Sequence, residues 1–297
     1  MTAALDGVLV CDKPAGMTSH DVVARVRRLA GQRRVGHGGT LDPPATGVLV
    51  IGVGRATRLL PFLPMEPKRY LATIAFGAET DTLDAAGAIV AAAPVDGVDR
   101  AALSSALARF TGPQEQVPPM VSAVKQGGER LYVKARRGET VERAPRLITV
   151  HALELHDFKP GPPPCATLAV TCSGGTYVRV LAADLGRALG SLAHLVSLRR
   201  TAVGAFTEAE AHPLDELEAR VRATDGALEA AVIDPAAAMR SISVRSLTEG
   251  EAAALATGQS LEATGLGEPV AAVGPDGRLV AVIQDGAGRA RPKVVLG

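Results

Sequence analysis

Residues 34–54 read RVGHGGTLDPPATGVLVIGVG and divide into two parts of opposite character. The first part, residues 36–44, is rich in glycine and proline, which favours an irregular loop with a tightly defined path. The second part, residues 46–53, is an apolar run typical of a buried strand. Asp42 is the only acidic residue of the stretch. A loop anchored on buried structure is a suitable place to hold a reactive carboxylate, although an Asp before a proline also fits the simpler role of capping a turn.

Strands and helices are predicted on both sides of this stretch. Thr18 or Ser19 can cap a helix over residues 20–30, with Asp21 in its favourable first turn. Residues 69–76 alternate cleanly, which predicts a strand with Tyr70 on its apolar side. We also predict strands near 7–12, 147–158, 166–173 and 195–206, and helices over 100–110, from about 176 to 189, and over 213–222. The order shows no regular βα alternation and therefore favours an α+β protein over a Rossmann-type fold.

The end of the chain predicts a separate small domain. Residues 225–239 are the best candidate for a linker or a final helix. Beyond them, a Pro275-Asp276-Gly277 turn between short apolar runs suggests a β-rich appendage. We therefore expect one domain over residues 1–230, with an extended basic insertion at about 117–146, and a second over 237–297.

Composition excludes several classes of protein. The 297 residues are 47% apolar, and 32 basic against 31 acidic side chains leave a formal charge of +1. These values exclude a bulk polycation and disorder driven by self-repulsion. No apolar stretch approaches the ~20 residues that cross a bilayer, and residues 1–10 lack the basic region of a secretory signal. Three widely spaced cysteines fit a reducing compartment, so we expect a cytoplasmic protein.

The basic residues are concentrated in two segments. Residues 1–70 hold ten basic and five acidic side chains, a net charge of +5, and residues 120–146 hold seven against three, a net charge of +4. Two basic patches on a nearly neutral chain suggest a polyanion held on one face. Solvated helix faces would produce the same pattern.

Two common kinds of chemistry have no support in the sequence. No Gly-Lys-Ser/Thr follows the glycines of residues 36–39, which excludes a P-loop. His37 and Asp42 have no suitable third ligand nearby, which argues against a metal site. We therefore expect neither a metal nor a cofactor.

Six segments in order resemble one known family. GHGGTLDPPATGVL (36–49) resembles the central motif of the TruB family, the tRNA pseudouridine-55 synthases. The other matching segments are LVCDKPAGMTSHDVV (9–23), KRYLATIAFGAETDTLDAAG (68–87), VPPMVSAVKQGGERLYVKARRG (117–138), and the pair SGGTYVRVLAADLG (173–186) and SLRRTAVGAF (197–206). The resemblance covers about the first 210 residues. One difference is Gly38, where the family more usually has threonine, and a glycine there would loosen the loop.

The resemblance implies a fold and a reaction. The fold is a mixed, largely antiparallel central sheet flanked by helices, with a small PUA-like C-terminal domain. The reaction isomerises a uridine of tRNA, at position 55 in the loop of the T arm, to pseudouridine without a cofactor. By resemblance Asp42 is the catalytic carboxylate, and Arg179 is the cation that keeps it ionised and oriented. Tyr70 stacks on the extruded base and helps to remove the proton from its C5 atom.

Further residues are assigned to substrate binding by the same resemblance. His37 fills the gap that the extruded base leaves, and Leu198 forms an apolar wall of the pocket. Tyr177 packs beside the pocket, although like Tyr70 it also suits an ordinary core position. Basic residues of the insertion, namely Lys125, Arg130 and Arg136, contact the backbone of the T arm. The implied partner is tRNA alone, bound by a monomer with no membrane and no metal.

Two other functions remain open from the residues. A non-catalytic tRNA-binding or tRNA-folding protein could use the same scaffold, although the presence of Asp42, Tyr70 and Arg179 argues against it. An unrelated hydrolase could use Asp42 and His37 as an acid–base pair, and it would leave an abasic site instead of a new nucleoside.

Overall fold

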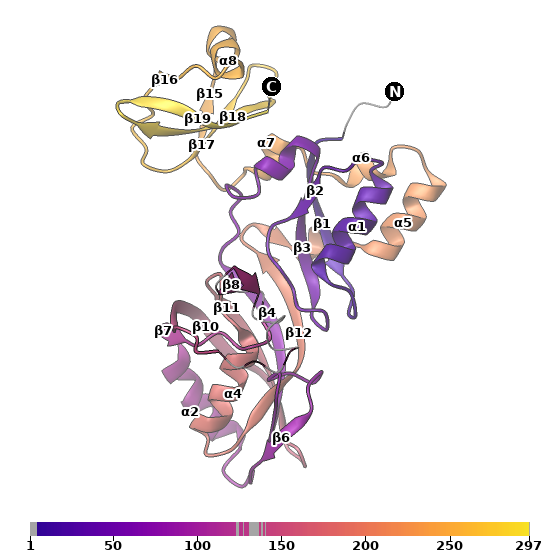
Figure 1. The fold of residues 1–297 in the computed structure, drawn as a ribbon, viewed down its shortest axis with the longest axis vertical. Coiled ribbons are helices and arrows are strands. Elements are labelled where there is room, and N and C mark those ends of the chain that lie inside the picture. Colours follow the sequence, from indigo (N-terminus) through magenta and orange to yellow (C-terminus); the bar gives the residue numbers. More distant parts are fainter. Residues whose placement is uncertain are drawn as a thin grey trace. The chain divides into compact units, whose positions relative to one another are not determined.

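The computed structural model describes residues 5–122, 125, 126, 128–130, 137, 139 and 141–296. The chain divides into two compact units, which Figure 1 shows as ribbons. The first unit combines Met1–Met65 with Val203–Gly297, and the second unit is Glu66–Ala202.

The first unit is built on the strand that the opening stretch of sequence predicted. Strand β3 runs over Thr46–Val53 and pairs antiparallel with β1 (Gly7–Lys13) and with β2 (Val35–His37). The two-residue strand β14 (His212–Pro213) pairs parallel with β1. The loop that carries Asp42 connects β2 to β3. Because these two strands pair with each other, both ends of the loop are fixed.

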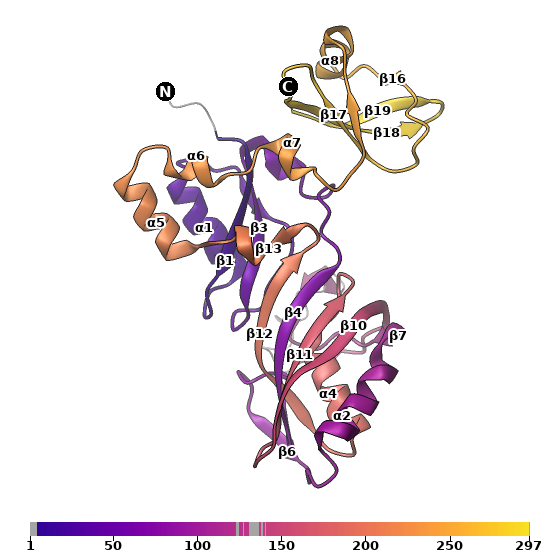
Figure 2. The same cartoon turned by 180° about the vertical axis from the view of Figure 1, so that it is seen from behind.

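Both faces of β1 and β3 are buried, which explains their unbroken apolar sequence. Leu9 and Ile51 pack in one buried cluster with residues of α1 (Ser19–Leu29) and α5 (Leu214–Ala223). Figure 2 shows these two helices beside β1 and β3. Alternate residues, among them Val10, point to the opposite face. Because neither face meets water, the register of these strands is strongly specified.

Helix α1 begins as its sequence predicted. The Thr18 hydroxyl accepts a hydrogen bond from the backbone N–H of Asp21, and the Asp21 carboxylate accepts one from the backbone of Thr18. This capping box satisfies donors that the first turn of a helix leaves without partners. Arg25 then ties α1 to α5, because its guanidinium lies 2.6 Å from both Asp215 and Glu218.

The C-terminal part of the first unit is a five-stranded sheet. Its strand order is β15-β17-β18-β19-β16, and the expected turn at 275–277 joins β17 to β18. The bounds are β15 (Val244–Ser246), β16 (Leu261–Glu262), β17 (Val270–Val273), β18 (Leu279–Gly286) and β19 (Arg289–Val295), with helix α8 at Glu249–Ala256.

This sheet shares a hydrophobic core with the strands β1 and β3. Val282 and Leu296 belong to the same buried cluster as Val10 and Met239. Polar contacts support this packing, because Arg58 donates a 2.8 Å hydrogen bond to the carbonyl of Val295, and Arg55 donates one to the carbonyl of Leu296. The cluster makes the last strands part of the core of this unit.

The second unit is an antiparallel sheet covered by helices. Its strand order is β12-β4-β11-β10-β7, and the helices α2 and α4 lie together on one side of it (Figure 1). The bounds are β4 (Lys68–Phe76), β7 (Gly112–Gln116), β10 (Arg146–Lys159), β11 (Cys165–Cys172), β12 (Ala193–Val203), α2 (Arg100–Leu107) and α4 (Val178–Ala188). On β4, the expected side is buried, from Tyr70 through Ala72 and Ile74.

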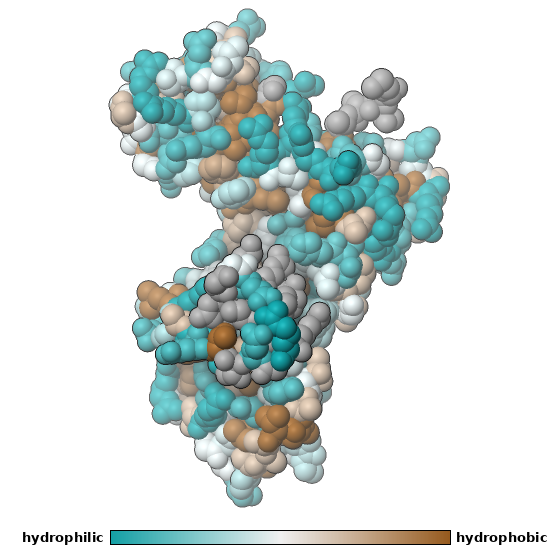
Figure 3. Space-filling model, viewed as in Figure 1, coloured by the Kyte–Doolittle hydropathy of each residue, from teal (hydrophilic) through white to brown (hydrophobic). Residues whose placement is uncertain are grey.

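Short elements complete the part of the chain that the structure describes. They are β5 (Ala78–Thr80), β6 (Ile89–Ala92), β8 (Lys125–Gln126), β9 (Glu129–Arg130), β13 (Phe206–Thr207), α6 (Ala227–Ala231), α7 (Pro235–Ala238), and three turns of 3₁₀ helix at Gly54–Arg58, Ala108–Phe110 and Glu208–Glu210. Ile89 and Val90 on β6 are 68% and 60% exposed and form part of the hydrophobic surface at the bottom of Figure 3.

The architecture confirms the predicted α+β class and the small C-terminal β-rich fold. The segment predicted as a linker or final helix contains two short helices, α6 and α7. The proposed domain boundaries at 230 and 237 stay a prediction. In the part of the chain that the structure describes, no helix is long and apolar enough to cross a membrane.

Replacing Met239 by alanine tests the shared core of the first unit. Met239 is fully buried among side chains of β1, β3 and the C-terminal sheet. Truncation leaves a cavity, so we expect the free energy of unfolding to fall by about 2–5 kcal/mol in a urea titration. The control is Val244→Ala, since Val244 is 59% exposed and its truncation should cost less than about 0.5 kcal/mol. Equal losses in the two variants would contradict a shared core.

Candidate active site

The backbone on both sides of Asp42 is held by buried polar side chains of the first unit. The fully buried ammonium of Lys13 donates hydrogen bonds to the carbonyls of Pro14 (2.9 Å), Met17 (2.7 Å) and Pro43 (3.1 Å). A buried charge is unfavourable unless it is fully paired, so these three acceptors and the ammonium stabilise one another.

The other neighbour of Asp42 is fixed from helix α1. The hydroxyl of Ser19 accepts a 2.9 Å hydrogen bond from the backbone N–H of Leu41 and lies 3.3 Å from the Leu41 carbonyl oxygen. The carbonyl of Asp42 accepts from Ala45, which closes a turn at 3.0 Å. The half-buried Asp42 therefore stands between two anchored residues, the arrangement that preorganises a reactive group.

His37 is held at the start of the same loop. Its Nδ1 atom accepts a 3.4 Å hydrogen bond from the backbone of Gly39, and its ring meets the ring of His20 edge-on, with 5.2 Å between centroids. The sequence offered no reason to connect His20 with this loop. The two histidines are brought together only because α1 packs beside β2.

Gly38 is closely packed. A Cβ atom at this position would lie 2.5 Å from the terminal methyl group of Met65 and 3.3 Å from a methyl group of Leu60. The backbone N–H of Gly38 donates a 2.9 Å hydrogen bond to Val50. The expected loosening therefore does not follow, because the space that a side chain would occupy is filled by Met65.

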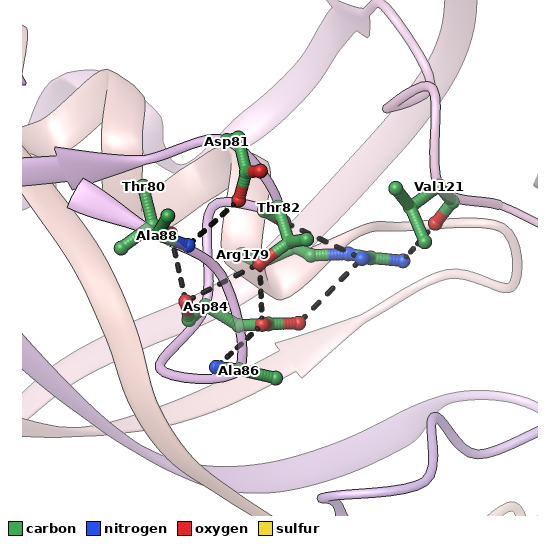
Figure 4. Close-up of polar contacts among 8 residues, drawn as sticks. All are labelled: Thr80, Asp81, Thr82, Asp84, Ala86, Ala88, Val121 and Arg179. Atoms are coloured by element: carbon green, nitrogen blue, oxygen red, sulfur yellow. Dashed lines mark hydrogen bonds and ion pairs between the residues drawn. The ribbon is translucent and has the colours of Figure 1, made fainter. Parts of the chain in front are cut away.

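Arg179 is a buried cation of the second unit. It lies in the first turn of α4, is only 4% exposed, and is drawn with its partners in Figure 4. Its Nη2 atom donates a 2.7 Å hydrogen bond to the carbonyl of Val121, and its Nη1 atom donates a 3.4 Å hydrogen bond to the carbonyl of Thr82. Nη1 also lies 3.6 Å from the Asp84 carboxylate, which forms a buried ion pair with it.

Asp84 is a partner of Arg179 that the sequence analysis did not identify. Its Oδ1 atom accepts from the Thr82 hydroxyl (2.7 Å) and from the backbone of Ala86 (3.0 Å), which leaves Oδ2 for Arg179 (Figure 4). Its own carbonyl accepts from the hydroxyl of Thr80 at 2.7 Å. The available signal was the segment DTLDAAG, in which an Asp before small residues favours a side-chain-stabilised turn.

Tyr177 and Arg179, two positions apart in sequence, are also close in space. The guanidinium carbon of Arg179 lies 5.8 Å from the centroid of the Tyr177 ring, within the range of a cation–π contact. Gln116 fixes the backbone of Tyr177, since its side chain accepts from the N–H at 2.7 Å and donates to the carbonyl at 3.1 Å.

The remaining predicted residues of the second unit lie on its sheet and its insertion. Tyr70 is buried on β4, and Leu198 is half-buried on β12. Lys125 and Arg130 lie in the paired strands β8 and β9, but their side chains are outside the described part of the structure. Arg136 lies outside the described residues altogether.

The predicted site residues are thus shared between the two units. His37 and Asp42 belong to the first unit, and the second unit contributes Tyr70, Tyr177, Arg179 and Leu198. Among the described residues, no group of three or more His, Cys, Asp or Glu side chains could hold a metal ion.

Comparison with known proteins gives consistent matches along the whole chain. Residues 27–178 match the N-terminal domain of the TruB family pseudouridylate synthases. Residues 179–239 match the C-terminal domain of tRNA pseudouridylate synthase B, and residues 242–297 match the C-terminal domain of tRNA pseudouridine synthase II.

Similar proteins cover nearly the full length. The tRNA pseudouridine synthase B of Thermobifida fusca is 48% identical over 98% of this chain and 98% of its own length. That of Symbiobacterium thermophilum is 53% identical over 79% of this chain and 76% of its own length. Among solved structures, a Cbf5-Nop10-Gar1 complex contains a chain that is 25% identical, with a TM-score of 0.75 over 97% of this chain and 84% of that one. This chain therefore belongs to the TruB family of tRNA pseudouridine synthases.

Proposed function

We propose that this pseudouridine synthase acts on the uridine at position 55, in the loop of the tRNA T arm, and that Asp42 is its catalytic carboxylate. The observation that carries the proposal is the anchoring of Leu41 by Ser19 and of Pro43 by Lys13. Two buried polar side chains, contributed by different elements, hold the backbone immediately before and after one carboxylate. An Asp that only capped a turn would not need such support.

The reaction needs a carboxylate more than any other group. The N1–C1′ bond breaks, the base rotates, and C5 bonds to C1′, so the product has the same atoms and the same oxidation state as the substrate. Cleavage of a glycosidic bond builds positive character on the sugar or requires a nucleophile at the ring. Asp42 can serve by attack at C1′, by attack at the base or by removal of a ribose proton, and all three need it ionised.

Arg179 is the proposed source of that ionisation. A closed pocket raises the pKa of a carboxyl group by desolvation, and a permanent cation nearby lowers it again. The Asp84 carboxylate and two carbonyl groups restrict the guanidinium of Arg179 to one orientation. A cation fixed in this way loses little freedom when it engages a second carboxylate, which supports its role as the partner of Asp42.

The RNA supplies the remaining requirements. Extruding a base from its helical stack costs a few kcal/mol, and stacking on the ring of Tyr70 would return ~1–3 kcal/mol. We propose that Tyr70 also accepts the proton from C5, that Tyr177 and Leu198 line the pocket, and that His37 fills the gap in the RNA. Lys125, Arg130 and Arg136 would add phosphate contacts that depend on salt.

Asp42→Asn tests the catalytic assignment. The amide is nearly isosteric but carries no charge and is a poor nucleophile, so we expect pseudouridine formation to fall by at least about 10⁴-fold. Affinity for a uridine-containing T-arm hairpin should change by less than about threefold, because the backbone anchors and the phosphate contacts remain. Single-turnover assays with nucleoside analysis, together with filter binding, measure both quantities. Turnover near the wild-type rate would remove Asp42 from the mechanism, and binding by a wild type that forms no pseudouridine would favour a tRNA-binding protein.

Arg179→Lys tests the need for a planar cation. One ammonium group cannot replace two guanidinium nitrogens that face Asp84 and Val121 in different directions. We expect the rate constant of the chemical step to fall by about 10- to 100-fold, with a smaller change in RNA affinity. The matched control is Arg187→Lys, an exposed arginine of the same helix with partners Glu79 and Asp184, which should leave the rate unchanged. Equal rates for Arg179→Lys and wild type would contradict the proposed pairing with Asp42.

A further inference from the structure

Arg200 is the largest fully buried side chain of the second unit. It lies on β12 and is 1% exposed. Arginine stays protonated in proteins, so the sheet contains a positive charge that is almost completely removed from water. Burial is the main effect that lowers the pKa of this guanidinium, and Tyr70 opposes it. A buried cation of this kind needs acceptors close to its fork.

One of these acceptors is the phenol of Tyr70. β12 and β4 are neighbouring strands, and the side chains of Arg200 and Tyr70 are joined by a hydrogen bond. A guanidinium has five donors and no acceptor, so the phenol oxygen must accept in this bond. The direction of this bond fixes the position of the phenol oxygen.

A second cation, Lys68, lies near this pair. Lys68 lies two residues before Tyr70 and on the same side of β4, opposite Cys172 of β11. Burial and the repulsion from Arg200 both lower the pKa of Lys68, whereas Glu66 raises it. Two cations and one carboxylate therefore surround this part of the sheet, and a nearby positive charge stabilises a phenolate relative to a phenol.

We propose that Arg200 is a positioning residue of the reaction, which holds the phenol oxygen of Tyr70 in place and favours the ionised form that accepts the proton from C5. In this step C5 has already bonded to C1′. The phenolate takes the proton, the electron pair of the C5–H bond returns to the ring, and Tyr70 becomes neutral. The inference rests on the proposed role of Tyr70 and adds the residue that supports it.

A purely structural arginine would show the same burial, so the test must depend on the phenol oxygen. We would compare wild type, Arg200→Gln, Tyr70→Phe and the double variant, all as the full chain, in single-turnover assays on a T-arm hairpin at saturating protein. We expect Arg200→Gln to slow the chemical step by about 10-fold or more in the wild-type background. In the Tyr70→Phe background, where no oxygen remains to be held, the same change should slow it by less than about twofold.

Two further variants serve as controls for the charge of Arg200 and for the loss of an arginine elsewhere in the unit. Arg200→Lys keeps a cation at the site and should retain more activity than Arg200→Gln. Arg109→Gln changes an exposed arginine of the same unit and should leave the rate unchanged. Equal slowing by Arg200→Gln in both backgrounds would show that Arg200 acts independently of the phenol, and would overturn the proposal.

A spectroscopic titration tests the pair without relying on activity. The chain has three tyrosines, so Tyr132→Phe with Tyr177→Phe leaves Tyr70 as the only phenol that ionises. In that background, we expect Arg200→Gln to raise the midpoint of the tyrosinate absorbance by about one pH unit or more. An unchanged midpoint would overturn the pairing even if the enzyme is active. An inactive wild type with a shifted midpoint would instead contradict the proposed function alone.

Discussion

The ammonium of Lys13 determines the geometry around Asp42. A charge with no exposure to water must be satisfied by the protein, and it is satisfied here by carbonyls from three points of the chain, one of them Pro43. The energetic cost of leaving any of these groups without a partner keeps β1, the turn before α1 and the Asp42 loop in one arrangement. The glycines and prolines of the loop make this backbone conformation accessible, and the hydrogen bonds of the buried Lys13 ammonium stabilise it over other conformations.

The second unit uses the same principle with the opposite division of charge. Here a buried carboxylate, that of Asp84, orients a buried cation, that of Arg179. The carboxylate is itself oriented by Thr82 and by the backbone of Ala86. Such placement favours catalysis, because groups that are already oriented need no reorganisation when charge develops.

The sequence predicted most of the fold and the parts of the site that lie within short motifs. The apolar run of β3, the capping box of α1 and the alternation of β4 are local patterns, and the structure agrees with each of them. The contacts of Arg200 and His20 could not be found in this way, and for Asp84 the sequence indicated only a turn and not its ion pair with Arg179. Each of these residues contacts a segment that is distant in sequence. Thr82 and Arg179, for example, are 97 positions apart, and a local pattern of residues cannot predict a contact over such a distance.

Gly38 shows why a single position is hard to interpret from sequence alone. The absence of a side chain at position 38 suggests a flexible backbone. The structure shows instead that the thioether of Met65 occupies the space that a side chain would fill. A threonine at position 38 would need this thioether to move, which is feasible because methionine has three rotatable bonds. The two positions are therefore coupled. A small residue at position 38 leaves room for a long one at position 65. The rigidity of the loop therefore comes from the packing of Gly38 against Met65 and from the hydrogen bonds that anchor Leu41 and Pro43.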